Sequence, residues 1–224
     1  MVEVRLRRAR RRERTELEQL ATAARRYAAL GWPVCQGAHP PRAKPGFAGS
    51  GRACSCDRIG CPAPGAHPVS PVWQLQATAD PVTAGRQWAA TPEANVILVT
   101  GRVFDVLDVP AAAALAALAE LDRAQVTPGP VAATTGRVLF FVATRGAPAQ
   151  PDEWWSCHLD CAPDEDVQPG GLRWHCRDSY VPAPPSRDGL GLAAHWIREP
   201  EGRRLPDAVR LLEYLADASG ESPQ

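Results

Sequence analysis

Three cysteines and one histidine lie within fourteen residues of this chain, in the segment CSCDRIGCPAPGAH that begins at Cys54. The segment is rich in glycine and proline and has almost no large apolar residue, so it cannot fold by burying a core of its own. Three thiolates and one imidazole are a normal tetrahedral ligand set for zinc, and metal binding then supplies the folding energy. The sequence therefore predicts a structural zinc site with four ligands: Cys54, Cys56, Cys61 and His67.

The length of the surrounding loop is a second reason to expect a metal. Residues 35–70 show no periodic pattern, and so long a loop without secondary structure is uncommon in a compact domain. The C-x-C-x4-C-x5-H spacing is rarer than paired C-x2-C motifs, so free thiols and a disulfide remain alternatives. Cys35 and His39 are reserve ligands if one of the four does not bind.

A second group of possible ligands lies in the C-terminal half. By ligand type, a second zinc site is possible there, although its members have no standard spacing. The alternatives are partly buried thiols beside a hydrogen-bonded histidine in a sheet, or a cysteine nucleophile with a histidine base. The residues concerned are Cys157, Cys161, His175 and Cys176.

Composition limits the class of protein. The chain has 224 residues, 25 Lys and Arg against 25 Asp and Glu, and therefore no net charge that would favour nucleic acid or membrane as a whole. The N-terminus is charged, and no apolar run is long enough to span a bilayer, so we expect a cytoplasmic protein without a membrane partner. Residues 1–14 are predicted as a basic flexible arm that contacts nucleic acid or is simply solvated, and residues 219–224 as a disordered tail.

The elements that position these residues alternate between helices and strands in residues 15–218, which we expect to form a single α+β domain. Thr15-x-x-Glu18 fits a capping box, and Asp80-Pro81 fits a helix N-terminus. Further helices are expected after Pro110 and Asp207. Sequence alternation and turn signals predict strands at 95–99, 103–109, 131–134, 138–143, 172–176, 180–183 and 195–197. The strands 95–99 and 103–109 are expected to pair as a hairpin.

Several segments in this order resemble the N-terminal domain of bifunctional DNA primase/polymerases, in the archaeo-eukaryotic primase superfamily. The resemblance covers roughly residues 20–215. It implies an α/β unit joined to an RRM-like, mostly antiparallel sheet, with an inserted zinc-binding loop and a two-metal nucleotidyl-transfer site on the sheet. The segments are YAALGWPV from Tyr27, Lys44-Pro45, the Cys54–Pro68 loop, WQLQATAD from Trp73, Asn95–Gly101, Val106–Val109 and YVPAPPS from Tyr180.

The chain departs from the expected catalytic set. Asp108 matches the first metal-binding carboxylate, but the second position is Pro110. Asp105 does not replace it, because residues three apart on a regular strand face opposite sides. Val138 stands where the resemblance implies a histidine, and Arg173 stands where it implies the third acid. One carboxylate cannot hold two hard cations, so we predict that Asp108 is a catalytic remnant and that nucleotidyl transfer is absent or very weak.

Without catalysis, the chain would act by binding DNA, a nucleotide, or a replication or regulatory protein. The alternatives are an active nucleotidyltransferase that uses Mg or Mn at a rearranged site of Asp105, Asp108 and Asp160 or Asp178, and a structural zinc protein that serves regulation. Basic and aromatic side chains in the second half could hold phosphates or bases, or could pair with acids and pack in the core. The candidate binding residues are Lys44, Arg137, Arg173, Arg177, Tyr180 and Ser186.

Overall fold

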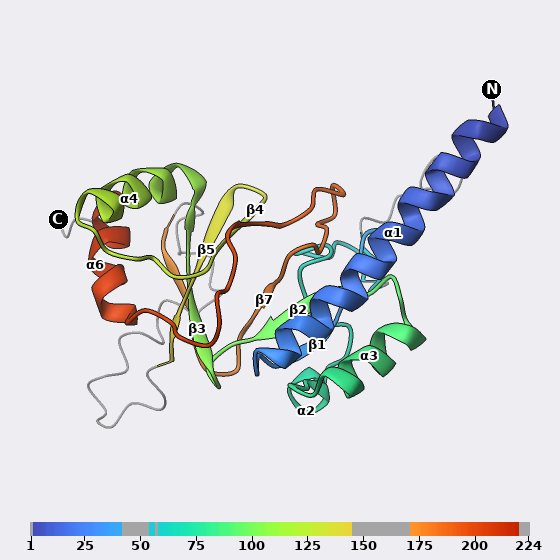
Figure 1. The fold of residues 1–224 in the computed structure, drawn as a ribbon, viewed down its shortest axis with the longest axis horizontal. Coiled ribbons are helices and arrows are strands. Elements are labelled where there is room, and N and C mark those ends of the chain that lie inside the picture. The colour runs from blue at the N-terminus through green and yellow to red at the C-terminus, as the bar shows by residue number, and fades with distance from the viewer. Residues whose placement is uncertain (1, 42–53, 57, 145–170, 220–224) are drawn as a thin grey trace. The chain divides into compact units, whose positions relative to one another are not determined.

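The computed structural model describes residues 2–41, 54–56, 58–144 and 171–219 (Figure 1). The chain forms two compact units. Unit 1 comprises Met1–Leu98 and Pro182–Ala193, and unit 2 comprises Val99–Val181 and Ala194–Gln224. The mixture of helices with antiparallel sheets confirms the predicted α+β class. In the part of the chain that the structure describes, no helix combines the length and apolar character needed to cross a membrane.

Unit 1 contains a small sheet and two longer helices. In the sheet the strand order is β1-β2-β7, and β1 is antiparallel to β2 with Val34 opposite Leu98. The helices α1 and α3 pack against each other and against β1, and Tyr27, Trp32 and Trp88 are buried in the core. The elements are α1 (Val2–Ala29), β1 (Val34–Gly37), α2 (Trp73–Gln76), α3 (Pro81–Ala90), β2 (Asn95–Val99) and β7 (Tyr180–Pro182), and of β7 only Pro182 falls within the bounds of unit 1.

The predicted helix starts have different outcomes in α3 and α1. Asp80 caps α3 as expected, because its carboxylate accepts hydrogen bonds from the backbone N–H groups of Val82 and Thr83. The capping box at Thr15 is wrong, since α1 already begins at Val2. The Thr15 hydroxyl instead donates to the Arg11 carbonyl, 2.9 Å away, as threonines inside helices often do. Residues 2–14 thus belong to this helix.

Unit 2 is a five-stranded sheet with two helices on one face. The strand order is β6-β3-β5-β4-β8. The helices α4 and α6 contact each other and β3, and Figure 1 shows them together on one side of the sheet. Leu107, Val109, Leu121, Phe140 and Leu211 belong to the core between helices and sheet. The elements are β3 (Phe104–Pro110), α4 (Ala111–Arg123), β4 (Val131–Thr134), β5 (Arg137–Ala143), β6 (Arg173–His175), β8 (His195–Arg198) and α6 (Ala208–Ala218).

The predicted pairing of β2 with β3 is wrong, because the two strands belong to different sheets. Between them, the Thr100 N–H donates to the Ser179 carbonyl at 3.0 Å, and Gly101 has a positive φ of 76°. After β2 the chain therefore leaves the first sheet, and β3 does not return to pair with β2 as a hairpin would. The strand β3 pairs with β5 and β6, and the predicted β4–β5 hairpin is confirmed.

Candidate metal centre and the Asp108 face

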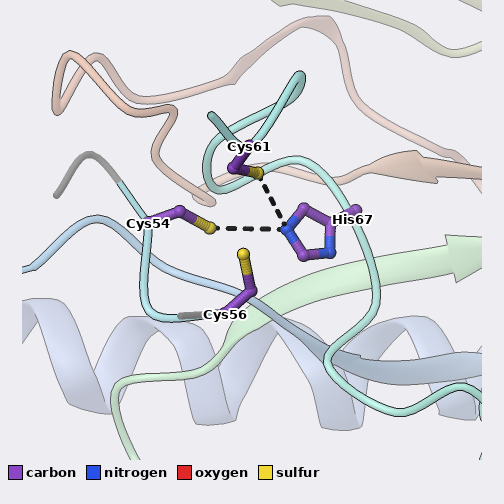
Figure 2. Close-up of side chains that lie close together, drawn as sticks. All are labelled: Cys54, Cys56, Cys61 and His67. Carbon is purple, nitrogen blue, oxygen red and sulfur yellow. Dashed lines mark hydrogen bonds between the residues drawn. The ribbon is translucent and has the colours of Figure 1, made fainter. Parts of the chain in front are cut away.

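The four predicted zinc ligands come together in the connection between β1 and α2 (Figure 2). One ligand atom from each of Cys54, Cys56, Cys61 and His67 lies within 4.8 Å of the others. The Sγ atoms of Cys54 and Cys61 are each 3.4 Å from His67 Nε2. A tetrahedral zinc ion with ordinary bond lengths separates sulfur and nitrogen ligands by about 3.5 Å. The donor types and their spacing therefore fit a metal ion such as zinc.

The imidazole of His67 is already oriented for this role. Its Nδ1 lies 2.8 Å from the carbonyl oxygen of Pro68. A carbonyl can only accept a hydrogen bond, so Nδ1 carries the proton and Nε2 directs its lone pair toward the sulfur atoms. A hydrogen bond of this kind on the far nitrogen is the usual support of a metal-binding histidine, because it sets both tautomer and ring orientation.

The thiols of the cluster differ in acidity. A hydrogen bond from the Arg58 backbone N–H, with smaller contributions from the thiols of Cys54 and Cys61, lowers the pKa of Cys56 to about 7 against the opposing effect of burial. Burial, with contributions from Cys56 and Cys54, raises the pKa of Cys61 to about 11. Cys56 therefore ionises more readily than Cys61, and a bound cation would favour the thiolate form of its ligands.

Backbone hydrogen bonds hold the loop against the rest of unit 1. The Ala38 N–H donates to the His67 carbonyl at 2.8 Å. The buried side-chain amide of Asn95, at the start of β2, donates to the Gly65 carbonyl at 2.8 Å and the Arg187 carbonyl at 2.6 Å. Gly65 has a φ of 77°, and a Cβ there would lie 2.3 Å from the Arg187 carbonyl oxygen. The loop position thus depends on a glycine and a buried amide.

The reserve ligands are not part of this cluster. Cys35 is buried in β1, and the ring of His39 makes its contact with the Pro40 carbonyl at 3.1 Å. His39 contributes instead through its backbone, whose N–H and carbonyl both bond to Ser55. For the possible second zinc site, Cys157 and Cys161 lie outside the described residues. The two ring nitrogens of His175 lie within hydrogen-bond distance of Ser179 Oγ and Asp108 Oδ2.

Asp108 forms the centre of a different arrangement on the sheet of unit 2. Its Oδ1 accepts a hydrogen bond from Arg137 Nε at 2.6 Å, and its Oδ2 lies 3.2 Å from His175 Nε2. Arg137 Nη2 also donates to the carbonyls of Asp108 and Gly171, each at 2.8 Å. Arg173 is the residue opposite Asp108 in the β3–β6 pairing. We call these four side chains the Asp108 face: Asp108, Arg137, Arg173 and His175.

The sequence does not predict that His175 contacts Asp108. The only available signal was its position two residues after Arg173, which places both side chains on one face of a strand. The structure pairs Arg173 with Asp108 and His175 with Val106, so the histidine reaches the carboxylate diagonally. Without the register between β3 and β6, this contact is invisible in the sequence.

The described acidic residues of the predicted rearranged site, Asp105, Asp108 and Asp178, do not form a cluster. Asp105 accepts a hydrogen bond from Trp174 Nε1 at 3.3 Å, and Trp174 belongs to the core that α4 and α6 cover. Asp105 thus lies on the opposite side of β3 from Asp108, as the alternation of a strand requires. Asp178 is exposed in a turn with a φ of 61°, and Asp160 lies outside the described residues. The described residues hold no cluster of acids able to share a metal ion.

The remaining candidate binding residues are in varied settings. Arg173 is half-buried, whereas Arg177 is exposed and lies 3.7 Å from an Asp178 carboxylate oxygen. Tyr180 is half-buried at the start of β7. The Ser186 hydroxyl is buried between strands, where it donates to the Val96 carbonyl and accepts from its N–H. Lys44 lies outside the described residues.

Comparison with known families gives one match. A model of the family described as bifunctional DNA primase/polymerase, N-terminal, matches residues 24–210. That range includes the cysteine and histidine cluster as well as the whole Asp108 face. No curated protein matches the chain.

Proposed function

Because the chain belongs to the bifunctional DNA primase/polymerase N-terminal family, we propose that it binds the phosphates of DNA or nucleotides without catalysing nucleotidyl transfer. The proposed binding site is the Asp108 face. A zinc ion at Cys54, Cys56, Cys61 and His67 would hold the loop of unit 1 together and take no part in chemistry.

The ion pair between Asp108 and Arg137 is the observation that carries this proposal. Two-metal phosphoryl transfer requires carboxylates that clamp two divalent ions. The Asp108 carboxylate is only 8% exposed, and the Arg137 guanidinium occupies one of its oxygens at 2.6 Å. The other oxygen faces His175. A divalent ion would have to displace both partners and would find no second carboxylate among the described neighbours.

The charge of the Asp108 face supports phosphate binding. It combines one carboxylate with two guanidinium groups and an imidazole, where a two-metal site would collect acids. The Arg173 side chain has no described hydrogen bond or ion pair, and the residue is half-buried opposite the neutralised Asp108. A guanidinium in that setting is suited to bidentate contact with a phosphate. Binding should therefore need no divalent cation.

The test combines binding and primer extension on the zinc-containing full chain. Fluorescence anisotropy with labelled single-stranded DNA and with a labelled nucleotide should show binding without added Mg²⁺, which weakens as salt rises. Primer extension should be absent in both Mg²⁺ and Mn²⁺. Extension that disappears in Asp108→Ala would contradict the proposal and favour the active enzyme. Failure to bind any nucleic acid or nucleotide would favour the protein-interaction role.

A pair of arginine variants locates the site. Arg173→Ala should weaken binding at least about tenfold, because a charge-assisted contact contributes roughly 1.5–3 kcal/mol. Arg210→Ala is the matched control, since it removes the same charge from an exposed position on α6, which covers the other side of the sheet. Equal losses in the two variants would indicate general electrostatic attraction and would exclude a site at the Asp108 face.

A further inference from the structure

A serine hydroxyl, an imidazole and a carboxylate form a continuous hydrogen-bonded chain in unit 2. The Oγ of Ser179 lies 3.1 Å from His175 Nδ1. The other ring nitrogen, Nε2, lies 3.2 Å from Asp108 Oδ2. Ser179 is half-buried and follows the turn between β6 and β7. Nucleotide binding gives this hydroxyl no role, so its contact with the histidine needs a separate explanation.

The carboxylate of Asp108 determines which atom donates in each of these two hydrogen bonds. A carboxylate only accepts hydrogen bonds, so the neutral His175 ring carries its proton on Nε2 and donates it to Asp108. The lone pair of Nδ1 then accepts the hydrogen bond that the Ser179 hydroxyl donates. This is the tautomer in which an imidazole can take a proton from a serine.

We propose that Ser179 is a nucleophile, with His175 as its general base and Asp108 as the positioning residue, and that it reacts with small activated carboxylic esters. A nucleophile within reach of a base that a third group orients is the arrangement of serine acyl-transfer sites, which recurs in unrelated folds. This proposal does not rest on nucleotide binding, because its nucleophile, Ser179, is not one of the four side chains of the Asp108 face and its reaction needs no bound nucleotide.

The reaction proceeds in two balanced steps. Ser179 Oγ attacks the ester carbonyl, its proton passes to His175 Nδ1, and the ester C–O bond breaks as the departing alkoxide takes that proton. An acyl-serine and an alcohol result. A water molecule then attacks the acyl-serine, again giving a proton to His175, and the carboxylic acid leaves as the proton returns to Ser179 Oγ.

The surrounding side chains preorganise the base. Asp108 cannot turn away from His175, because its other oxygen is bound to Arg137 and Arg137 in turn donates to the Gly171 carbonyl. Arg173 lies on the same face of β6 as His175, two residues away. Its positive charge on that face favours the oxyanion that develops when the carbonyl is attacked.

A fluorophosphonate probe tests the nucleophile directly on the zinc-containing full chain. The Ser179 oxygen would form a bond to phosphorus while the P–F bond breaks, and the product is a stable adduct. Peptide mass spectrometry should find this adduct at Ser179, and the protein should hydrolyse p-nitrophenyl acetate at a rate that the probe abolishes. An unlabelled Ser179 in the wild-type protein overturns the proposal.

Variants show whether His175 activates the Ser179 hydroxyl or whether the hydroxyl reacts simply because the probe can reach it. His175→Gln keeps a polar side chain of similar size but removes the base, so Ser179 labelling should slow about 10²–10⁴-fold. Ser179→Ala should lose the adduct, and Ser219→Ala is the matched control with unchanged labelling, since its hydroxyl bonds only within the α6 terminus. Circular dichroism shows which variants fold. Equal labelling rates in folded His175→Gln and wild-type protein would overturn the proposal even where nucleotide binding is intact.

Discussion

The cysteine and histidine cluster of unit 1 and the Asp108 face of unit 2 both occupy positions where a metal ion is expected, but only the first keeps its donors available. In the cluster, the Sγ atoms of Cys54 and Cys61 each lie 3.4 Å from His67 Nε2, and no cationic side chain is described among the four ligands. At the Asp108 face, a guanidinium lies 2.6 Å from the carboxylate. The first site could therefore hold a cation among its donors, whereas the second already pairs its carboxylate with a guanidinium.

The two sites also differ in how their residues are positioned. The cluster lies on a loop that backbone hydrogen bonds and the Asn95 amide hold in place. The Asp108 face lies on paired strands, where register alone brings Arg173 opposite Asp108. A loop can form a metal site from neighbours in the sequence, whereas a sheet combines residues far apart. This difference suggests that loss of the metal would disturb the first region much more than the second.

The largest expected effect comes from breaking the cluster. Cys54→Ser should remove the bound metal and destabilise unit 1 by at least about 5 kcal/mol, because structural zinc contributes about 10–16 kcal/mol to the folding of zinc-finger peptides. Metal analysis should find one zinc per chain in the wild-type protein and none in the variant. Calorimetry should show a lowered transition in the variant.

The reserve ligand supplies the matched control for this change. His39→Gln alters a histidine whose described hydrogen bonds to the cluster segment come from its backbone. It should keep one zinc per chain and a melting temperature close to that of the wild-type protein. Full metal content in Cys54→Ser would show that the ligand set is misassigned and that Cys35 or His39 takes part.

A smaller loss is expected from removing the internal cation of unit 2. Arg137→Met leaves the carboxylate of Asp108 buried without its ion partner, which costs about 3–5 kcal/mol in other proteins. Asp108→Asn in the same background should recover a large part of this loss, since it removes the unpaired charge. Urea unfolding of both single variants and the double variant measures the coupling. Strictly additive losses would show that Arg137 and Asp108 are not energetically coupled. This would contradict the view that Arg137 acts as the cation of the Asp108 face.

Features determined by neighbouring residues were predictable from the sequence. The cap of Asp80 and the turn between β4 and β5 depend on residues two to four positions apart, and the structure confirms both. The helix α6 also begins after Asp207 as expected. Leu211 and Leu215 are buried in this helix, whereas Leu212 is only partly buried against the same core. Leu211 and Leu212 both fit an apolar stripe, and only packing against the sheet distinguishes them.

The candidate sites divide in the same way. The convergence of the four metal ligands was predictable because their spacing is short and their donor chemistry is specific. The partners of Asp108 were not, because they come from β5 and β6, which are 29 and 67 residues away along the chain. Pattern alone also paired β2 with β3, since two apolar runs beside a glycine turn suit a hairpin. Long-range register is the information that composition and periodicity lack.

The smallest expected effect comes from substituting two glycines of the cluster segment, and it tests how unit 1 holds this loop in place. Gly65→Ala and Gly60→Ala both place a side chain at positive φ, 77° and 67°, which costs roughly 1–2 kcal/mol. At Gly65 the new Cβ would also collide with the Arg187 carbonyl, whereas at Gly60 nothing lies within 4 Å. Gly65→Ala should therefore lower both stability and zinc affinity clearly more than Gly60→Ala, as chelator competition and thermal melting can measure. Equal effects would mean that backbone conformation alone, and not docking of the loop, maintains the ligand geometry.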